Sequence, residues 1–181
     1  MDCRGSLLAL ELTIGAHMAI AYTPSADGLS HPHAEHLMTP FSTTRHFPSK
    51  PADVFAAVKD GKRLARWWGP NGFSNRFEVF EFQPGGRWIF SMIGPDGTVY
   101  PNESVFSRIE ADRLVVIRHI CPPVFELTIT LEPLDDGTRL EWVQAFSDPS
   151  VARAVAHIVA PANEENLDRL GAELGLDKHP G

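Results

Sequence analysis

The chain has 181 residues, of which 43% are hydrophobic and 22% are charged, and its formal net charge is −7. The length favours one domain with terminal extensions, and the composition is typical of a globular protein that buries a core. The negative charge excludes nucleic acid and anionic membrane surfaces as expected partners, because both bind cationic surfaces.

The first 40 residues do not show the pattern of a folded element, and we expect them to form a flexible extension. Glu11 and His17 interrupt an early apolar run, which is therefore too short and too polar to span a membrane. Residues 22–40 contain three histidines without a fourth ligand at fixed spacing, so we expect no metal and no cofactor. The two cysteines of the chain are too few for a disulfide framework, which favours a cytoplasmic protein.

The folded part begins with a strand and two short helices. The segment "FSTTRHF", Phe41–Phe47, alternates in polarity and contains β-branched residues, which predicts a strand. The segment "PADVFAAV" starts with Pro51 and places its apolar side chains on one helical face. A second helical segment, "GKRLARWW", ends at Gly69 and Pro70.

Six further strands are predicted, joined by tight turns that contain Gly, Pro or Asp. They span Phe77–Phe82, Arg87–Ile93, Thr98–Ile109, Leu114–Ile120, Phe125–Leu131 and Arg139–Phe146. Consecutive hairpins of this kind form an antiparallel meander. Asp148 and Pro149 then begin a C-terminal helix, which Pro161 is expected to kink or restart.

The turns set a register that places most apolar side chains on one face of the sheet, with Met92 opposite Val99. The inner face then contains Phe80, Phe82, Trp88, Phe90, Met92, Glu103, Val105, Ile109, Leu114, Val116, Arg118, Ile120, Phe125, Leu127, Ile129, Leu131, Leu140, Trp142, Gln144 and Phe146. The outer face contains Ser104, Phe106, Val115, Ile117 and His119.

Four short segments carry a family resemblance: "VFAAVKDGKRLARWWGPNGF", "FQPGGRW", "PDGTVY" and "RLVV". Together they resemble the bacterial branch of the SRPBCC (START and birch-pollen-allergen) superfamily that is related to the activator of Hsp90 ATPase. The resemblance covers Thr43 to Leu174 and implies an α+β helix-grip fold. In this fold a curved antiparallel sheet, here of about seven strands, wraps around a long C-terminal helix, and two short helices follow the first strand. Where that family commonly carries a Gly-Trp pair in its last helix, this chain has Ala162 and Asn163.

The predicted organisation is a flexible extension over residues 1–40, a helix-grip domain over residues 41–176 and a tail over residues 177–181. The resemblance implies a cavity between the sheet and the C-terminal helix that accepts an apolar or amphipathic small molecule. The expected function is the binding of such a molecule, with no reaction assigned. An exposed edge strand also leaves a homodimer open.

Three polar residues interrupt the predicted inner face: Glu103, Arg118 and Gln144. Glu103 and Arg118 lie on neighbouring strands, near enough for their long side chains to meet. Because an isolated buried charge is costly, both must pair or face water if they point inward. Inside a cavity, Arg118 would orient a carboxylate, carbonyl or enolate and Glu103 would accept a proton, as in a cyclase-type or hydrolase-type enzyme. The alternative is a structural or solvent-exposed pair.

The residues that we expect to bind the ligand are Trp68, Phe80, Phe82, Trp88, Phe90, Met92, Glu103, Arg118, Phe125, Leu127, Trp142, Gln144, Phe146 and His157. Adjacent side chains diverge by roughly 100° on a helix. We therefore expect Trp68 at the cavity wall and Trp67 over the notch beside the short helices or over the cavity entrance, with His157 at the cavity mouth. A third interpretation is a chaperone-partner domain similar to the Hsp90 activator, which would expose Phe106 and Ile117 on the convex face of the sheet.

Overall fold

The computed structural model describes residues 40–176, which form one antiparallel sheet and three helices. The strands are β1 (Phe41–Phe47), β2 (Ser74–Phe80), β3 (Arg87–Ile93), β4 (Val99–Glu110), β5 (Leu114–His119), β6 (Phe125–Leu134) and β7 (Gly137–Phe146). The helices are α2 (Pro51–Lys59), α3 (Gly61–Trp67) and α4 (Pro149–Glu173). The predicted extension, apart from Pro40, and the predicted tail lie outside the described residues.

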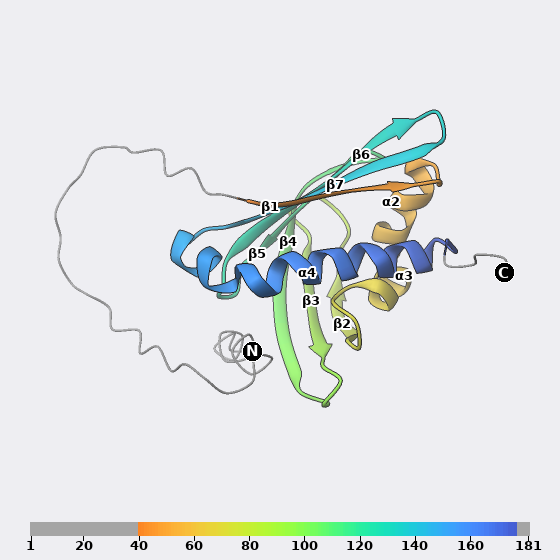
Figure 1. Cartoon of the computed structure of the whole chain (residues 1–181). Helices are drawn as coiled ribbons and strands as arrows, with labels where there is room; N and C mark the ends of the chain where they lie inside the picture. The colour runs from red at the N-terminus through yellow and green to blue at the C-terminus, as the bar shows by residue number, and fades with distance from the viewer. Residues whose placement is uncertain (1–39, 177–181) are drawn as a thin grey trace, which may run out of the picture.

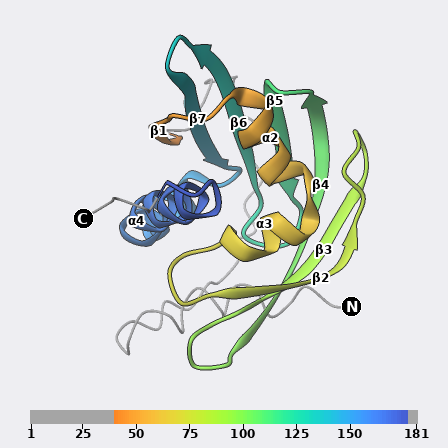
Figure 2. The ribbon, with the colours of Figure 1, turned by 90° about the vertical axis from the view of Figure 1, so that its right-hand side faces the viewer.

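The sheet has the order β1-β7-β6-β5-β4-β3-β2, so β1 and β2 form its two edges. Helix α4 runs the length of the domain in front of the sheet (Figure 1). Seen along α4, the sheet curves around this helix and around the short helices α2 and α3 (Figure 2). This is the α+β helix-grip architecture that the sequence predicts.

Local sequence sets where the helices begin. Pro51 occupies the first turn of α2, where its missing N–H costs no hydrogen bond. The Asp60 carboxylate accepts hydrogen bonds from the backbone N–H groups of Lys62 and Arg63 at 2.8 and 3.2 Å and so caps α3. At the start of α4, the Asp148 carboxylate accepts from the backbone N–H of Ser150 at 2.7 Å, as the Asp-Pro pair predicts.

A restart of the helix at Pro161 is wrong, because α4 is one continuous helix of 25 residues. A proline inside a helix removes one N–H donor, which leaves the carbonyl four residues earlier, that of His157, without its usual partner. Pro161 and His157 are both exposed, so this carbonyl lies on the side of the helix that faces solvent. Packing of α4 against β1, β7 and α3 then keeps the helix continuous.

The predicted inner face is correct on β6 and β7 and wrong on most of β4 and on β5. On β6 and β7, Leu127 lies opposite Gln144 and Ile129 opposite Trp142, and all four side chains are buried. Met92 of β3, however, pairs with Tyr100 and not with Val99. This one-residue difference turns the even-numbered residues of β4 inward up to a bulge between Phe106 and Arg108. The inward residues are therefore Asn102, Ser104 and Phe106 on β4 and Val115, Ile117 and His119 on β5.

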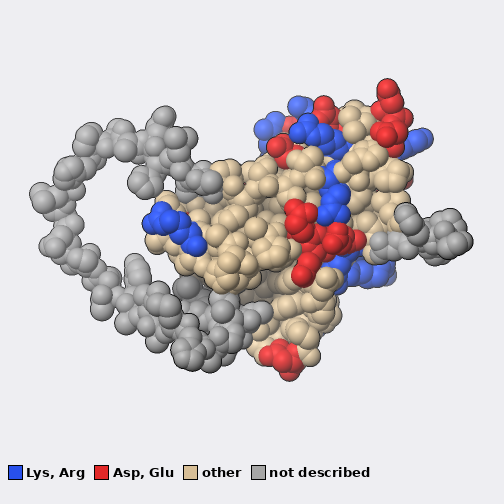
Figure 3. Space-filling model, in the orientation of Figure 1, with Lys and Arg blue, Asp and Glu red and all other residues tan. Residues whose placement is uncertain are grey.

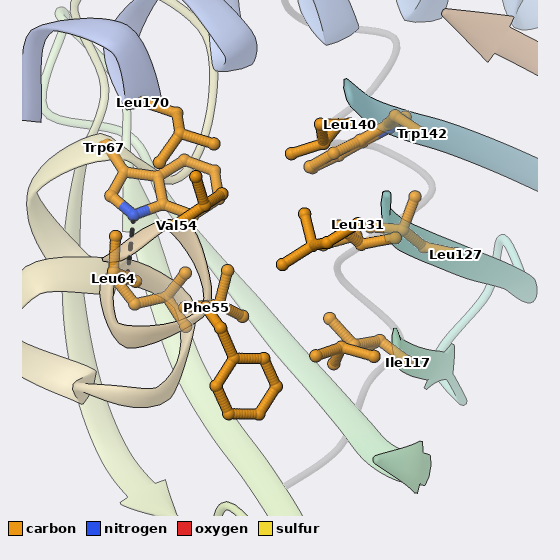
Figure 4. Packing of buried hydrophobic residues seen from close by; sticks show 14 of the residues in the cluster. Val54, Phe55, Leu64, Trp67, Ile117, Leu127, Leu131, Leu140, Trp142 and Leu170 are labelled. Atoms are coloured by element: carbon orange, nitrogen blue, oxygen red, sulfur yellow. Dashed lines mark hydrogen bonds between the residues drawn. The ribbon is translucent and has the colours of Figure 1, made fainter. Parts of the chain in front are cut away.

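A hydrophobic core closes one end of the curved sheet. Figure 4 shows side chains of α2, α3 and α4 pointing toward the inner face of the sheet. They are Val54, Phe55, Leu64, Trp67 and Leu170 on the helices and Ile117, Leu127, Leu131, Leu140 and Trp142 on the sheet. Full burial of an aliphatic side chain contributes about 1.5–3 kcal/mol. This core therefore fixes the short helices to one end of the sheet and leaves the other end to α4 alone.

Ion pairs attach the C-terminal half of α4 to its neighbours. Arg45 of β1 binds Glu164 and Asp168 at 2.8 and 2.6 Å, and Arg63 and Arg66 of α3 bind Glu173 at 2.8 and 2.7 Å. In Figure 3 these charges gather over the C-terminal half of α4, whereas the surface over its N-terminal half is mostly uncharged. Partly exposed pairs of this kind stabilise by only about 0.2–1 kcal/mol each, so they orient the helix more than they hold it.

Candidate ligand-binding cavity

A cavity of about 240 Å³ lies between α4 and the inner face of the sheet. Its walls come from the loop after α3, from strands β3 to β7 and from the middle of α4. Most lining side chains are aromatic or aliphatic, and among the described residues no Asp, Glu, Lys or Arg lines the cavity. Typical ligand pockets measure about 300–1,000 Å³, so this cavity lies below that range and suits only a ligand smaller than a drug-sized one.

The loop between α3 and β2, residues 68–73, forms one wall of the cavity. The Arg169 guanidinium of α4 donates hydrogen bonds to five backbone carbonyls, those of Arg66, Trp68, Gly69, Pro70 and Phe73, at 2.7–3.2 Å. The Asn166 side chain accepts a hydrogen bond from the Gly69 N–H at 2.6 Å. Helix α4 therefore holds this wall through backbone groups, which leaves the loop side chains free to face the cavity.

Gly69 has a conformation that its position requires. Its φ is +91°, and a Cβ atom there would lie 2.6 Å from the terminal methyl group of Met92. Only glycine adopts this backbone conformation without strain. Gly69 therefore turns the chain out of α3 and allows Met92, which lines the cavity, to pack against the loop.

The adjacent tryptophans have separate positions, as the helical spacing predicts. Trp67 is 1% exposed, and its indole N–H donates to the Ala57 carbonyl at 3.0 Å, which joins α3 to α2. Trp68 lines the cavity and packs against Trp88 and Trp142, with ring centroids 4.8 and 5.5 Å away. Trp68 is thus part of the cavity wall, and Trp67 lies in the core beside the short helices.

His119 is a buried polar residue in the cavity wall, although the predicted register placed it outside. It is 3% exposed, and its ring stacks on Phe125 with centroids 4.7 Å apart. Nδ1 lies 3.1 Å from the Pro123 carbonyl oxygen and Nε2 lies 3.2 Å from Oδ1 of Asn102. Burial lowers the pKa of His119, and backbone hydrogen bonds with Pro123 and Cys121 oppose this only in part. The Pro123 carbonyl and the Asn102 side chain therefore orient the imidazole in the wall.

Besides His119 and Asn166, three buried polar side chains line the cavity: Ser104 on β4, Gln144 on β7 and Asn163 on α4. They are 3%, 8% and 6% exposed, respectively. Within residues 40–176, none of the three side chains makes a hydrogen bond to the protein. Because buried polar groups are normally paired, these groups are available to a molecule in the cavity.

Eight of the residues predicted to bind a ligand line the cavity: Trp68, Phe90, Met92, Phe125, Leu127, Trp142, Gln144 and Phe146. Phe80, Phe82 and Trp88 do not line it, because they pack against one another and against Phe106 in the aromatic core. His157 is exposed on α4 and also lies outside the cavity lining.

Glu103 and Arg118 do not meet in the cavity. Both residues lie on the outer face of the sheet, because the true register of β4 and β5 is the opposite of the predicted one. Glu103 pairs with Arg87 at 2.8 Å, and Arg118 is exposed opposite Glu126 of β6. Glu103 and Arg118 are therefore charges on the outer surface, which is the alternative that the sequence left open.

The expected convex patch is also wrong. Phe106 and Ile117 are 0% and 2% exposed and lie on the inner face, where Ile117 lines the cavity. The surface proposed for a chaperone partner is therefore not built from these side chains.

The remaining lining residues were not assigned from the sequence: Gly69, Pro70, Phe73, Tyr100, Asn102, Ser104, Ile117, His119, Pro123, Ile158, Val159, Ala162, Asn163 and Asn166. The lining residues on α4 could have been predicted from the spacing of its buried residues. Val155, Val159, Asn163, Asn166 and Leu170 recur at intervals of three or four residues, which places them on one face of a continuous helix. The sequence prediction missed this pattern because the helix was expected to kink or restart at Pro161.

The curved sheet, the helix that it surrounds and the cavity between them define a helix-grip protein with an apolar cavity. The model of the family described as activator of Hsp90 ATPase homolog 1-like protein matches residues 48–175. The chain belongs to this family.

Solved structures of bacterial proteins share the fold. A protein from Arthrobacter aurescens is 27% identical, with a TM-score of 0.71 over 78% of this chain and 92% of that one. Protein NE0264 from Nitrosomonas europaea is 19% identical, with a TM-score of 0.69 over 77% and 96% of the two chains. The AHSA1 protein from Silicibacter pomeroyi is 22% identical, with a TM-score of 0.64 over 77% and 99%. No curated protein is similar enough to the chain to give a match.

Neither a membrane helix nor a metal cluster is found in the part of the chain that the structure describes. None of its helices combines the length and hydrophobicity needed to cross a bilayer. Across residues 40–176, His, Cys, Asp and Glu side chains do not gather in groups of three or more that could hold a metal ion. The histidines of residues 22–39 lie outside the described residues.

Proposed function

We propose that the protein binds a small apolar or amphipathic molecule in the cavity between α4 and the sheet. The cavity itself carries this proposal, because it is apolar, aromatic-walled and supplied with a few polar groups that have no protein partner. A concave apolar site with a small number of convergent polar groups is the usual form of a small-molecule site. Membership of the family is consistent with this function but does not name the ligand.

The two alternative functions depend on residues that do not lie where these functions need them. A cyclase or hydrolase using Glu103 and Arg118 needs both inside the cavity, and both lie on the outer face. A partner-binding surface using Phe106 and Ile117 needs them exposed, and both are buried. Neither a catalysed reaction nor binding of a protein partner is supported by the described residues as well as small-molecule binding is.

A cavity-filling variant tests the proposed function. Ala162 lines the cavity from α4, whereas Ala160 lies two residues earlier on the exposed side of the same helix. Ala162→Trp is expected to fill the cavity and abolish binding of naphthalene, measured by isothermal titration calorimetry. Ala160→Trp is the matched control, because it adds the same ring to the same helix outside the cavity, and it is expected to bind as the wild type does.

Native mass spectrometry of the purified chain gives an independent test. A co-purifying small molecule that is present with Ala160→Trp and absent with Ala162→Trp supports the proposal. Binding of naphthalene that survives Ala162→Trp in a folded variant contradicts it, because the probe then occupies another place.

A cytoplasmic location, the domain boundaries and a homodimer remain predictions. The location follows from the small number of cysteines, and the dimer follows from the two edge strands β1 and β2. Sedimentation equilibrium of the purified chain measures the oligomeric state directly.

A further inference from the structure

Two side-chain amides in the cavity wall have no protein partner for their polar atoms. Gln144 and Asn163 are 8% and 6% exposed, line the cavity and make no side-chain hydrogen bond within residues 40–176. Their carbonyl oxygens and N–H groups are therefore available to a molecule in the cavity. Their neighbour Asn166 shows the contrast, because its amide both accepts from Gly69 and donates to the Ala162 carbonyl.

The two amides come from elements that pack against each other. Helix α4 contacts β1 and β7, and Thr43 of β1 donates a hydrogen bond to Glu164, the residue after Asn163. Thr43 pairs with Trp142, and Gln144 is the next inward-facing residue of β7. The helix amide and the strand amide therefore lie at the same end of the cavity. Ser104, in contrast, lies on β4, separated from β7 by two strands.

The described cavity lining contains no Asp, Glu, Lys or Arg, and this selects against ionic ligands. Among the described residues, no carboxylate, ammonium or guanidinium group lines the cavity, and burial lowers the pKa of His119. A carboxylate, phosphate or ammonium group on a ligand would therefore lose its hydration without gaining a counter-charge. An amide offers both a carbonyl acceptor and N–H donors, which match a hydroxyl or carbonyl group.

The geometry points to Gln144 and Asn163 as the residues that determine ligand specificity: they select an uncharged molecule with an apolar body and a hydroxyl or carbonyl group. The aromatic walls of Trp68, Phe125 and Trp142 contact the apolar body, and the two amides bind the polar group. This inference rests on the proposed function, since it specifies what the same cavity accepts.

Three probes with one ring system test the inference on the wild-type chain: naphthalene, 2-naphthol and 2-naphthoate. They share the apolar body and carry no polar group, a neutral hydroxyl group and an anionic carboxylate, respectively. The Kd of 2-naphthol is expected to be about threefold to tenfold lower than that of naphthalene, the effect of about one net hydrogen bond. The Kd of 2-naphthoate is expected to be at least about tenfold higher than that of 2-naphthol, because its charge is buried without a partner.

Variants that keep the shape of the side chains assign this preference to residues. The double variant Gln144→Met and Asn163→Leu is expected to bind naphthalene within about threefold of the wild type and to lose its preference for 2-naphthol. Gln83→Met is the matched control, because Gln83 is exposed in the loop after β2, outside the cavity. The control is expected to keep the wild-type order of the three probes.

The possible negative results distinguish the inference about the polar group from the proposed function. If naphthalene and 2-naphthol bind the wild type equally, or if 2-naphthoate binds most tightly, the polar inference is wrong while the proposed function stands. A preference for 2-naphthol that persists in the folded double variant also overturns the inference, because other groups then supply the hydrogen bond. If none of the three probes binds, both the inference and the proposed function fail.

Discussion

Removal of the Arg169 guanidinium is expected to destabilise the fold through the loop that forms one cavity wall. The Arg169 side chain donates five hydrogen bonds to backbone carbonyls within residues 66–73. In Arg169→Met the aliphatic part of the side chain is kept and all five bonds are lost. Water can reach some of these carbonyls, so the lower value of about 0.5 kcal/mol per bond applies, which amounts to about 2–3 kcal/mol in total.

Urea denaturation measures this loss as a difference in the free energy of unfolding. Arg153→Met is the matched control, because Arg153 is exposed near the start of α4, and we expect a change within about 0.5 kcal/mol. Arg169→Lys is expected to fall between Arg169→Met and the wild type, since an ammonium group cannot reach carbonyls on two sides as a planar guanidinium does. An Arg169→Met protein as stable as the control would refute the view that these bonds hold the loop.

Three further predictions concern the core, the buried histidine and the outer face. Leu170→Ala is expected to cost about 2–5 kcal/mol in urea denaturation, because Leu170 is 0% exposed between α3 and the sheet; a loss below about 1 kcal/mol contradicts the packing. Burial lowers the pKa of His119 in the folded chain below the ordinary histidine value of 6.5. As the pH falls below 6.5, the unfolded chain therefore binds a proton that the folded chain does not, and stability declines. His119→Gln is expected to reduce the difference in stability between about pH 7.5 and about pH 5.5, and an unchanged difference argues against this linkage. Glu103→Ala and Arg118→Ala, singly or together, are expected to leave the Kd of 2-naphthol within about twofold of the wild type, because both side chains lie outside the cavity; a larger change would place them in the site.

The fold could be predicted because several local signals agree. The turn residues, the apolar alternation of β6 and β7 and the Asp148 cap each specify one element without reference to the others. Gly69 and Pro70 mark the end of the short helices in the same way. These signals act over a few residues, so the sequence alone contains them.

The register of β4 and β5 could not be read because both faces of these strands carry apolar side chains. Val105 and Val116 on the outer face are as apolar as Phe106 and Ile117 on the inner face. When alternation is weak, the hairpin turn decides the register, and the pairing of Met92 with Tyr100 differs from the prediction by one residue. That residue decides which polar groups enter the cavity, so Glu103 and Arg118 lie outside it.

The amides of the cavity depend on the tertiary arrangement. Gln144 was predicted on the inner face from the alternation of β7, but Asn163 reaches the same end of the cavity only because α4 continues through Pro161. A helix that restarts at Pro161 would have no defined rotation relative to the sheet. The continuity of α4 is therefore the feature that unites the two amides.

The most direct test of the proposed cavity is the set of intermolecular nuclear Overhauser effects between bound 2-naphthol and the methyl groups of the chain. Ile117 of β5, Leu127 of β6 and Val159 of α4 line the cavity from different sides and are buried. We predict contacts from the naphthol ring to all three residues at once, because all three line the same cavity. Contacts confined to exposed methyl groups such as those of Val99, which is 50% exposed, would contradict the account.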